Sequence, residues 1–251
     1  MSLVGWNLEI KEMSWVENTE KEVDFIIESI NLKGNARILD LACGFGRHSL
    51  ELSRRGYSVV GVDYTKEYID DAVSTAEKEK LNVSFIQADV LTLTYSEEFD
   101  VVLNMADGAI GYFDTEEENL KLFDVISKAL KKGGKHVMAI CSADHAKKHC
   151  PKRGWQAGKK GLSIADFTWN DETSRLFYNG NYFRFGKILE PFNDQLERAE
   201  GDEGLRLYTV EELKSIFATR NMRIINAYGD YDTTKPASED MFMLVVCSEK
   251  E

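Results

Sequence analysis

The chain has 251 residues, of which 43% are hydrophobic, so it can bury the core of one domain with an insertion. Its formal net charge of −12 argues against a nonspecific grip on nucleic-acid phosphates, which requires clustered Lys and Arg. The four cysteines lack the C-x-x-C spacing of a metal site, and the sequence shows neither a signal peptide nor a long apolar run. We therefore expect a soluble, reduced, cytoplasmic protein that binds neither nucleic acid nor a membrane.

A strand and a small-residue turn occupy residues 37–48, which read Arg-Ile-Leu-Asp-Leu-Ala-Cys-Gly-Phe-Gly-Arg-His. The strand ends in the carboxylate of Asp40, and the turn that follows opens a helix. The small residues of this turn are Ala42, Gly44 and Gly46. Residues 57–63 form a second apolar strand ending in Asp63, an acid placed to accept hydrogen bonds from a ribose. These elements make half of a nucleotide-binding α/β unit and predict an adenosine-containing cofactor, which the glycines allow to approach the backbone.

Two interpretations of this turn compete. A dinucleotide fingerprint, G-x-G-x-x-G/A, would begin at Gly44, but it would place Ser49 at its third small position, after the bulky Arg47-His48 pair. From Asp40 the pattern is instead Asp-x-Ala-x-Gly-x-Gly. This pattern resembles the first motif of class I S-adenosylmethionine-dependent methyltransferases, D/E-x-G-x-G-x-G, with Ala42 in place of the first glycine. The ammonium group of that cofactor suits an acid or a carbonyl at a strand end, which favours the second interpretation over an NAD-dependent enzyme.

The segments downstream continue the alternation of strands and helices. A helix follows Asp63 with Thr65 as its cap, and the acidic run 116–118 suits the first turn of a helix continuing over 120–130. Further strands are expected at 83–89, 99–104, 136–140, 222–228 and 241–247. The last two have no helix between them, so they should pair antiparallel. Residues 105–113 then form a loop at the carboxyl end of the sheet, where ligands of open α/β sheets bind.

Residues 151–204 interrupt this pattern. Strands at 163–169 and 175–178, with a turn at 170–171, predict a β-hairpin, and 181–189 reads as a third strand. Thr209 and Glu212 have the spacing of a capping box at the start of the next helix. We expect a small antiparallel sheet, inserted after the fifth strand, that lies over the carboxyl end of the main sheet as a lid. A structural or dimerising flap is the alternative, and a homodimer is left open.

Several further segments narrow the resemblance. Residues 22–25, 44–48, 111–113, 206–209 and 228–232 together resemble a group of bacterial and archaeal small-molecule methyltransferases related to amino-sugar and glycine N-methyltransferases. The resemblance covers nearly the whole chain. It implies an α/β fold with a Rossmann-like, seven-stranded, doubly wound sheet whose last strand is antiparallel. It also implies an S-adenosylmethionine-binding domain at 1–150 and 205–251, with 151–204 as a β insertion. The chain departs from the group at 104–112, and it lacks the Asn/Asp-Pro-Pro-Tyr/Phe motif of adenine or glutamine methylation.

The motif positions give the expected contacts with S-adenosylmethionine. Asp40 and Asp63 are predicted to contact the cofactor because each ends a strand. The resemblance to the family implies that Asp89 and Val90 contact the adenine. His48 lies one turn into the first helix, where contact with the cofactor and simple helix packing are both open. The full predicted set is Asp40, Ala42, Gly44, Gly46, His48, Asp63, Tyr64, Asp89, Val90, Asn104 and Met105.

Asp107 and Tyr112 are the candidate catalytic residues, because they lie on the loop after the fourth strand. Asp107 would orient an amine, and Tyr112 would hydrogen-bond the substrate or face the sulfonium; a turn cap and a packing ring are the alternatives. Arg184 and Arg206 are candidates to hold a substrate carboxylate or phosphate, although as exposed strand residues they would need no such role. The other histidines show no ligand pattern, so no metal site is expected.

The predicted function is transfer of a methyl group to a small-molecule amine or hydroxyl. The sulfonium is already a strong electrophile, so the protein mainly aligns the acceptor in line with the S–CH3 bond and excludes water. A base is needed only where the acceptor must lose a proton. A protein or RNA methyltransferase, and a catalytically silent protein that binds S-adenosylmethionine, remain as alternatives.

Overall fold

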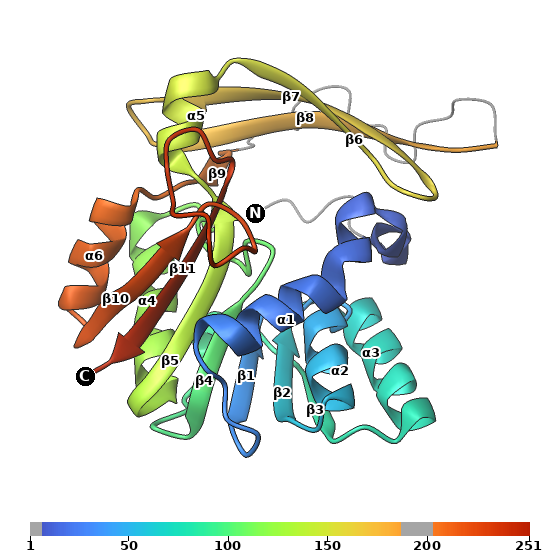
Figure 1. Ribbon diagram of the computed structural model, residues 1–251, viewed down its shortest axis with the longest axis vertical. Helices are drawn as coiled ribbons and strands as arrows, with labels where there is room; N and C mark the ends of the chain where they lie inside the picture. Colours follow the sequence, from blue (N-terminus) through green and yellow to red (C-terminus); the bar gives the residue numbers. More distant parts are fainter. Residues whose placement is uncertain (1–6, 187–202) are drawn as a thin grey trace.

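A seven-stranded sheet forms the centre of the fold (Figure 1), in a computed structural model that describes residues 7–186 and 203–251. Its strand order is β10-β11-β5-β4-β1-β2-β3. The strands are β1 (Arg37–Leu41), β2 (Ser58–Asp63), β3 (Val83–Gln87), β4 (Phe99–Asn104), β5 (Leu130–Cys141), β10 (Met222–Tyr228) and β11 (Met243–Lys250). All neighbours pair in parallel except β11, which is antiparallel to both β5 and β10. The predicted Rossmann-like, seven-stranded sheet with an antiparallel last strand is therefore confirmed.

Alternate residues of the central strands pack on opposite faces of this sheet. Leu39 and Leu41 of β1 join the cluster that covers one face, together with α4 (Glu116–Ala129) and α6 (Val210–Ala218). Ile38 joins the cluster on the other face, with Val23 and Ile26 of α1 (Thr19–Ser29). Helices α2 (Arg47–Arg54) and α3 (Lys66–Glu79) follow α1 beside that second face (Figure 1). Burial on both faces explains why these strands are continuous apolar runs.

Of the two predicted helix caps, one is present and one is not. Thr115 accepts a hydrogen bond from the Glu118 N–H at the start of α4, so the acids at 116–118 form its first turn as expected. Thr209 and Glu212 make the predicted capping box of α6. Thr65 was expected to cap α3, but its side chain makes no cap hydrogen bond. Asp63 instead accepts a hydrogen bond from the Thr65 N–H at 2.8 Å through its Oδ1, which holds the turn before the helix but caps none of the N–H groups of its first turn.

Two strand boundaries differ from the prediction. α4 passes directly into β5 at Leu130, so this strand begins at residue 130, whereas it was predicted to begin at 136. The last strand runs over Met243–Lys250, two residues later than expected. In both cases hydrogen bonding with neighbouring strands, which the local sequence does not show, sets the ends of the element.

The second sheet has four antiparallel strands, β6 (Lys152–Ala157), β7 (Gly161–Asn170), β8 (Arg175–Arg184) and β9 (Leu205–Arg206). The segments 175–178 and 181–189 were predicted as two strands, but the ladder continues through Gly180, opposite Ala165. A Cβ on Gly180 would lie 2.4 Å from the Tyr178 hydroxyl oxygen, so the tyrosine ring occupies the space above this glycine. The break expected at Gly180 was therefore wrong, β6 was not predicted, and residues 187–189 lie outside the described residues.

The second sheet lies across the side of the main sheet where the parallel strands end (Figure 1). At one end, Leu176 of β8 packs against Ala143 and Ala146 of α5 (Ala143–His149). At the other end, the Tyr182 hydroxyl donates to the Glu12 carbonyl at 2.8 Å, in the short helix η1 (Leu8–Glu12). The sheet is thus supported at both ends, as a cover over a site would be. The domain boundaries at 151 and 204 stay a prediction.

No helix within residues 7–186 and 203–251 is both long enough and apolar enough to cross a membrane.

Candidate active site

The turn after β1 has the backbone that its small residues predicted. Ala42, Gly44 and Gly46 all have positive φ, of 53°, 58° and 75°. The Gly44 N–H donates to Asp63 Oδ2 at 2.8 Å, so the acid at the end of β2 holds the turn in place. A Cβ on Gly44 would meet no atom within 4 Å, which leaves open space beside the turn. This is the close approach to a ligand for which a glycine is suited.

Asp40 is buried beside this turn, with 1% of its surface exposed. Burial raises the pKa of its carboxyl to about 7, although the Ser49 hydrogen bond and the charge of Arg47 act in the opposite direction. The Ser49 hydroxyl donates to Asp40 Oδ2 at 2.6 Å. The buried carboxyl therefore holds its proton more tightly than an exposed aspartate does, and a cation bound beside it would favour the ionised form.

His48 turns away from the turn and toward α1. Its Nε2 and Arg47 Nη2 both lie 2.7 Å from Glu22 Oε2, and all three residues are buried. Burial lowers the pKa of His48 to about 4, so the neutral ring donates its N–H to the carboxylate. Burial would raise the pKa of Glu22, but its bonds to His48 and Arg47 prevail and lower it. No role was predicted for Glu22 or Arg47, and the sequence signal for them was their place in the segments 22–25 and 44–48 that carry the resemblance.

Asn104, at the end of β4, anchors the loop that follows. It is fully buried, its Nδ2 donates to the Gly108 carbonyl at 2.7 Å, and its Oδ1 lies 3.1 Å from His136 Nε2. Its neighbour Met105 is also buried, in the cluster on the α1 face of the sheet. Any contact of Asn104 with a cofactor would therefore come from its main chain. Its predicted role as a cofactor residue is not tested by this arrangement.

The loop after β4 has an unusual backbone. Residues 106–109 have φ values of 51°, 67°, 49° and 64°, so four consecutive residues are left-handed. Each non-glycine residue in this conformation costs about 1–2 kcal/mol, and such runs are rare outside functional sites. Hydrogen bonds hold the loop, including the Asp107 N–H to the Ala139 carbonyl at 2.7 Å. The strain points to a function for the residues that this loop presents.

Asp107 and Tyr112 are brought together by this loop. The Tyr112 hydroxyl donates to Asp107 Oδ2 and the Cys141 N–H donates to Asp107 Oδ1, both at 3.3 Å. Burial raises the pKa of Asp107 to about 6, although these two bonds lower it. Burial and the neighbouring carboxylate raise the pKa of Tyr112 well above its usual value, so the phenol stays protonated. The pair combines a proton acceptor that ionises near neutral pH with a fixed hydroxyl donor.

Comparison with known proteins decides between the interpretations of the turn. A family described as a methyltransferase domain matches residues 32–181, which is more than half of the chain. The chain belongs to this methyltransferase family. It is 23% identical over 212 residues to YqeM of Bacillus subtilis, a protein named as a methyltransferase, covering 83% of this chain and 82% of that protein.

Two further similarities accompany this match. The methyltransferase is 30% identical over 161 residues to the ubiquinone biosynthesis O-methyltransferase of Pelagibacter ubique, covering 59% of this chain and 66% of that protein. A crystal structure of an S-adenosylmethionine-dependent methyltransferase from Clostridium acetobutylicum shares its fold, with a TM-score of 0.73 and 20% identity over 92% of each chain. The cofactor of the methyltransferase is S-adenosylmethionine.

The acidic residues near the ends of the first three strands fit S-adenosylmethionine. β1, β2 and β3 are neighbours in the sheet, so Asp40, Asp63 and Asp89 meet along one edge. Asp63 is bound to the turn, Tyr64 beside it is 64% exposed, and Asp89 is exposed with Val90 buried next to it. Asp89 also caps the short helix η3 (Val90–Thr92) by accepting from the Leu91 N–H at 2.9 Å. These residues would hold the adenosine, and Asp40 the ammonium; their individual contacts stay predictions.

Tyr231, for which the sequence analysis predicts no role, lies close to the Glu22 cluster and to Asp107. It lies between β10 and β11, and its ring meets Phe25 edge-on at 5.7 Å. Burial raises its pKa, and the charges of Glu22, Arg47 and Asp107 all act on its hydroxyl. The only sequence signal was its place in the segment 228–232.

Both arginines predicted to bind substrate form ion pairs within the protein. Arg184 Nε lies 2.6 Å from Glu12 Oε2, and its Nη2 lies 2.6 Å from Glu9 Oε1. Arg206 Nη2 lies 2.7 Å from Glu212 Oε1, with its guanidinium over the Tyr208 ring. The first pair ties β8 to the N-terminal segment, and the second ties β9 to α6. A substrate anion would have to compete with these carboxylates, and the predicted role is untested.

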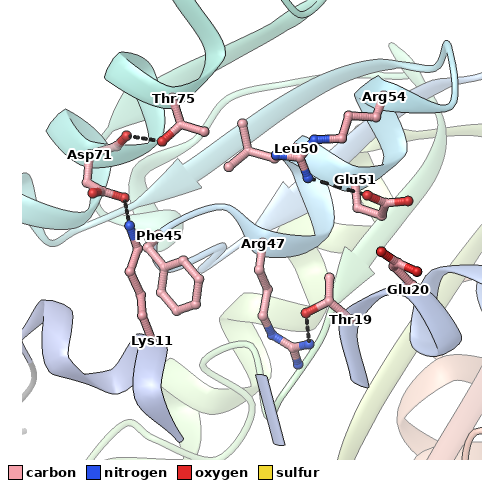
Figure 2. Close-up of a pocket in the computed structure, with 10 residues that line it drawn as sticks. All are labelled: Lys11, Thr19, Glu20, Phe45, Arg47, Leu50, Glu51, Arg54, Asp71 and Thr75. Carbon is pink, nitrogen blue, oxygen red and sulfur yellow. Dashed lines mark hydrogen bonds and ion pairs between the residues drawn. The ribbon is translucent and has the colours of Figure 1, made fainter. Parts of the chain in front are cut away.

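A hollow of about 250 Å³ lies outside this site, between η1, α2 and α3 (Figure 2). Lys11 in its wall is paired with Asp71, and Arg47 donates to the Thr19 hydroxyl at 2.9 Å. Its lining does not include Asp40, Asp63 or Asp107, so we assign it no part in the chemistry. In the part of the chain that the structure describes, no group of three or more His, Cys, Asp or Glu could hold a metal ion.

Two glycines of the turn provide a matched test of the cofactor site. In Gly44→Ala the new methyl enters open space, so stability should fall only by about 1 kcal/mol from the positive φ. The same methyl would stand where the cofactor approaches, and the Kd for S-adenosylhomocysteine should rise about tenfold or more. In Gly46→Ala the Cβ would lie 2.6 Å from the Phe85 ring, so the variant should lose about 2–5 kcal/mol of stability.

Urea unfolding and calorimetric titration with S-adenosylhomocysteine would measure the two effects separately. Wild-type affinity in Gly44→Ala would show that the cofactor does not approach this turn.

Proposed function

We propose that this methyltransferase methylates an amine or hydroxyl of a small molecule, with Asp107 and Tyr112 at the acceptor atom. The observation that carries the proposal is the hydrogen bond from the Tyr112 hydroxyl to Asp107 Oδ2, on a loop with four consecutive left-handed residues. Burial raises the pKa of the Asp107 carboxyl toward neutral pH, which suits a proton acceptor. The loop follows β4 at the carboxyl end of the sheet, where ligands of such folds bind.

The chemistry divides between cofactor and protein. S-adenosylmethionine, when bound, supplies an electrophilic methyl group on a positively charged sulfur. A hydroxyl, or an amine bound as its ammonium, must lose a proton before it can attack the methyl group, and ionised Asp107 would accept that proton. Tyr112 keeps its own proton and orients both Asp107 and the acceptor. The second sheet excludes water, which would otherwise compete as an acceptor.

Two observations favour a small molecule over a protein or RNA. The net charge of −12 does not suit the polyanionic backbone of RNA. The similar protein of Pelagibacter ubique is named for O-methylation in ubiquinone biosynthesis, which is a small-molecule reaction.

The direct test is methyl transfer from S-adenosylmethionine, detected by mass spectrometry, to a panel of small amines and hydroxylated metabolites. RNA and a protein extract serve as competing acceptors. Transfer to panel members supports the proposal. Transfer only to RNA or protein contradicts it, and cofactor binding with no transfer to any acceptor would indicate a silent binding protein.

Tyr112→Phe tests the acceptor side separately. Loss of the hydroxyl removes the bond to Asp107, so kcat should fall by about tenfold while the Kd for S-adenosylmethionine stays within about threefold. Steady-state kinetics and calorimetry measure the two quantities. A large loss of cofactor affinity with unchanged kcat would move Tyr112 from the acceptor to the cofactor.

A further inference from the structure

Arg175 is a buried arginine of the second sheet that reaches the loop carrying Tyr112. It begins β8 and is 9% exposed. Its Nη1 donates to the Gly204 carbonyl at 2.8 Å, and its Nη2 donates to the Asp114 and Phe113 carbonyls at 2.9 and 3.2 Å. A guanidinium with its fixed fork of donors is suited to holding several carbonyls in one arrangement. Arg175 therefore joins two segments that are about 60 residues apart in the chain.

The loop is held on both sides of Tyr112. Before it, the Gly111 carbonyl accepts from the Arg206 N–H at 2.9 Å, and a Cβ on Gly111 would lie 1.9 Å from the Arg206 oxygen. After it, Asn119 Oδ1 accepts from the Phe113 N–H at 3.2 Å, and its Nδ2 donates to the Phe113 carbonyl at 3.0 Å. The Phe113 carbonyl thus receives both Arg175 and Asn119. Tyr112 lies between two anchored peptides, and two of the anchors come from the second sheet.

We propose that Arg175 is a positioning residue, through which the second sheet holds the Tyr112 hydroxyl against Asp107. The inference rests on the role proposed for Asp107 and Tyr112. It gives the second sheet a part in the chemistry, in addition to covering the site. The bond from Tyr112 to Asp107 measures 3.3 Å, so a small shift of the loop is enough to break it. Arg175 does not touch the acceptor or the cofactor itself.

The pKa of Asp107 depends on the hydrogen bond from Tyr112, so it can be used to detect a change in the position of Tyr112. The groups that face its carboxyl are Tyr112, the Cys141 backbone and thiol, and Tyr231. Of these, the Tyr112 hydroxyl and the Cys141 N–H lower the pKa of Asp107. Release of Tyr112 would remove the first bond and raise the pKa of Asp107. A residue with only a structural role in the second sheet would leave that pKa unchanged.

The variant that tests the proposal is Arg175→Met, and Arg153→Met is its matched control. Arg153 is an exposed arginine of the same sheet, and its Nε lies 2.6 Å from Asp166. The pKa of Asp107 is measured from the carboxyl ¹³C resonance of labelled aspartate, assigned with Asp107→Asn. We expect it to rise by about half a pH unit or more in Arg175→Met and to stay constant in Arg153→Met.

Turnover provides the second readout once an acceptor is known. We expect kcat to fall about 10- to 100-fold in Arg175→Met, with the Kd for S-adenosylmethionine within about threefold. If Arg175→Met does not fold, Arg175→Lys keeps the charge but loses the fork, and it should shift the Asp107 titration in the same direction. An unchanged titration in either folded variant overturns the proposal. A shifted titration with no effect of Asp107→Asn on turnover would retain the positioning role and refute the proposed function instead.

Discussion

Asp107→Asn is expected to lower kcat for methyl transfer by on the order of 100-fold or more, the usual contribution of a general base. The amide has the shape of the carboxylate, and its oxygen can still accept from the Cys141 N–H, so the loop should keep its backbone. The affinity for S-adenosylmethionine should therefore stay within about threefold of the wild type. Steady-state kinetics with a saturating acceptor, together with calorimetry for the cofactor, measure the two values.

The pH profile makes this prediction more specific. Only the ionised carboxylate can accept a proton, so wild-type kcat should rise as the pH passes through the pKa of Asp107, about 6. The variant should lack that limb, and its residual activity should be flat across it. If Asp107→Asn kept both the wild-type kcat and its rise with pH, another group would have to accept the proton of the acceptor.

The same variant should be more stable than the wild type at alkaline pH. The pKa of Asp107 in the folded protein is about 6, against an ordinary value of 3.8. The carboxyl thus favours folding only while protonated, and this contribution is lost as the pH rises through about 6. Asp107→Asn should gain up to about 3 kcal/mol at pH about 8 and nothing at pH about 4. A gain in stability together with a loss of turnover is expected of a residue kept for catalysis.

The features that were predicted from the sequence are those determined by neighbouring residues. The turn after β1 needs small residues at alternate positions, and Asp63 follows an apolar strand directly, so both can be recognised locally. The short connection between β10 and β11 is also visible in the sequence, and it set the antiparallel last strand. The loop that carries Asp107 and Tyr112 was also predicted, because ligands of such sheets bind at the carboxyl ends of the strands, and the catalytic role of the two residues stays a proposal.

The features that were not predicted depend on residues that meet only in the folded chain. Arg184 was expected to hold a substrate anion, but its partners Glu9 and Glu12 lie more than 170 residues earlier. His48 was placed near the cofactor by its helical position, and its hydrogen bond to Glu22 of α1 requires the packing of two helices. The role of Arg175 depends on carbonyl oxygens, which leave no mark in a side-chain pattern.

Glu22→Ala is expected to cost about 3–5 kcal/mol of stability, because it leaves the buried charge of Arg47 without its carboxylate. Glu20→Ala is the matched control, since Glu20 is an exposed acid on the same helix, and its loss should change stability by about 0.5 kcal/mol or less. Urea unfolding at pH about 7.5 measures both. Equal stabilities for the two variants would show that Glu22 does not stabilise the fold as the partner of a buried charge.

Two further measurements separate the ion pair from simple packing. The double variant Glu22→Ala with Arg47→Met removes both charges. It should lose less stability than the sum of the two single variants, because each single variant leaves one buried charge without its partner and the double variant leaves none. The pKa of Glu22 in the folded protein lies below its ordinary 4.5, so its contribution is present above that pH and lost as the pH falls through the folded value. The difference between wild type and Glu22→Ala should therefore shrink in acid. A difference independent of pH would assign the loss to packing, since only the ionised carboxylate balances Arg47.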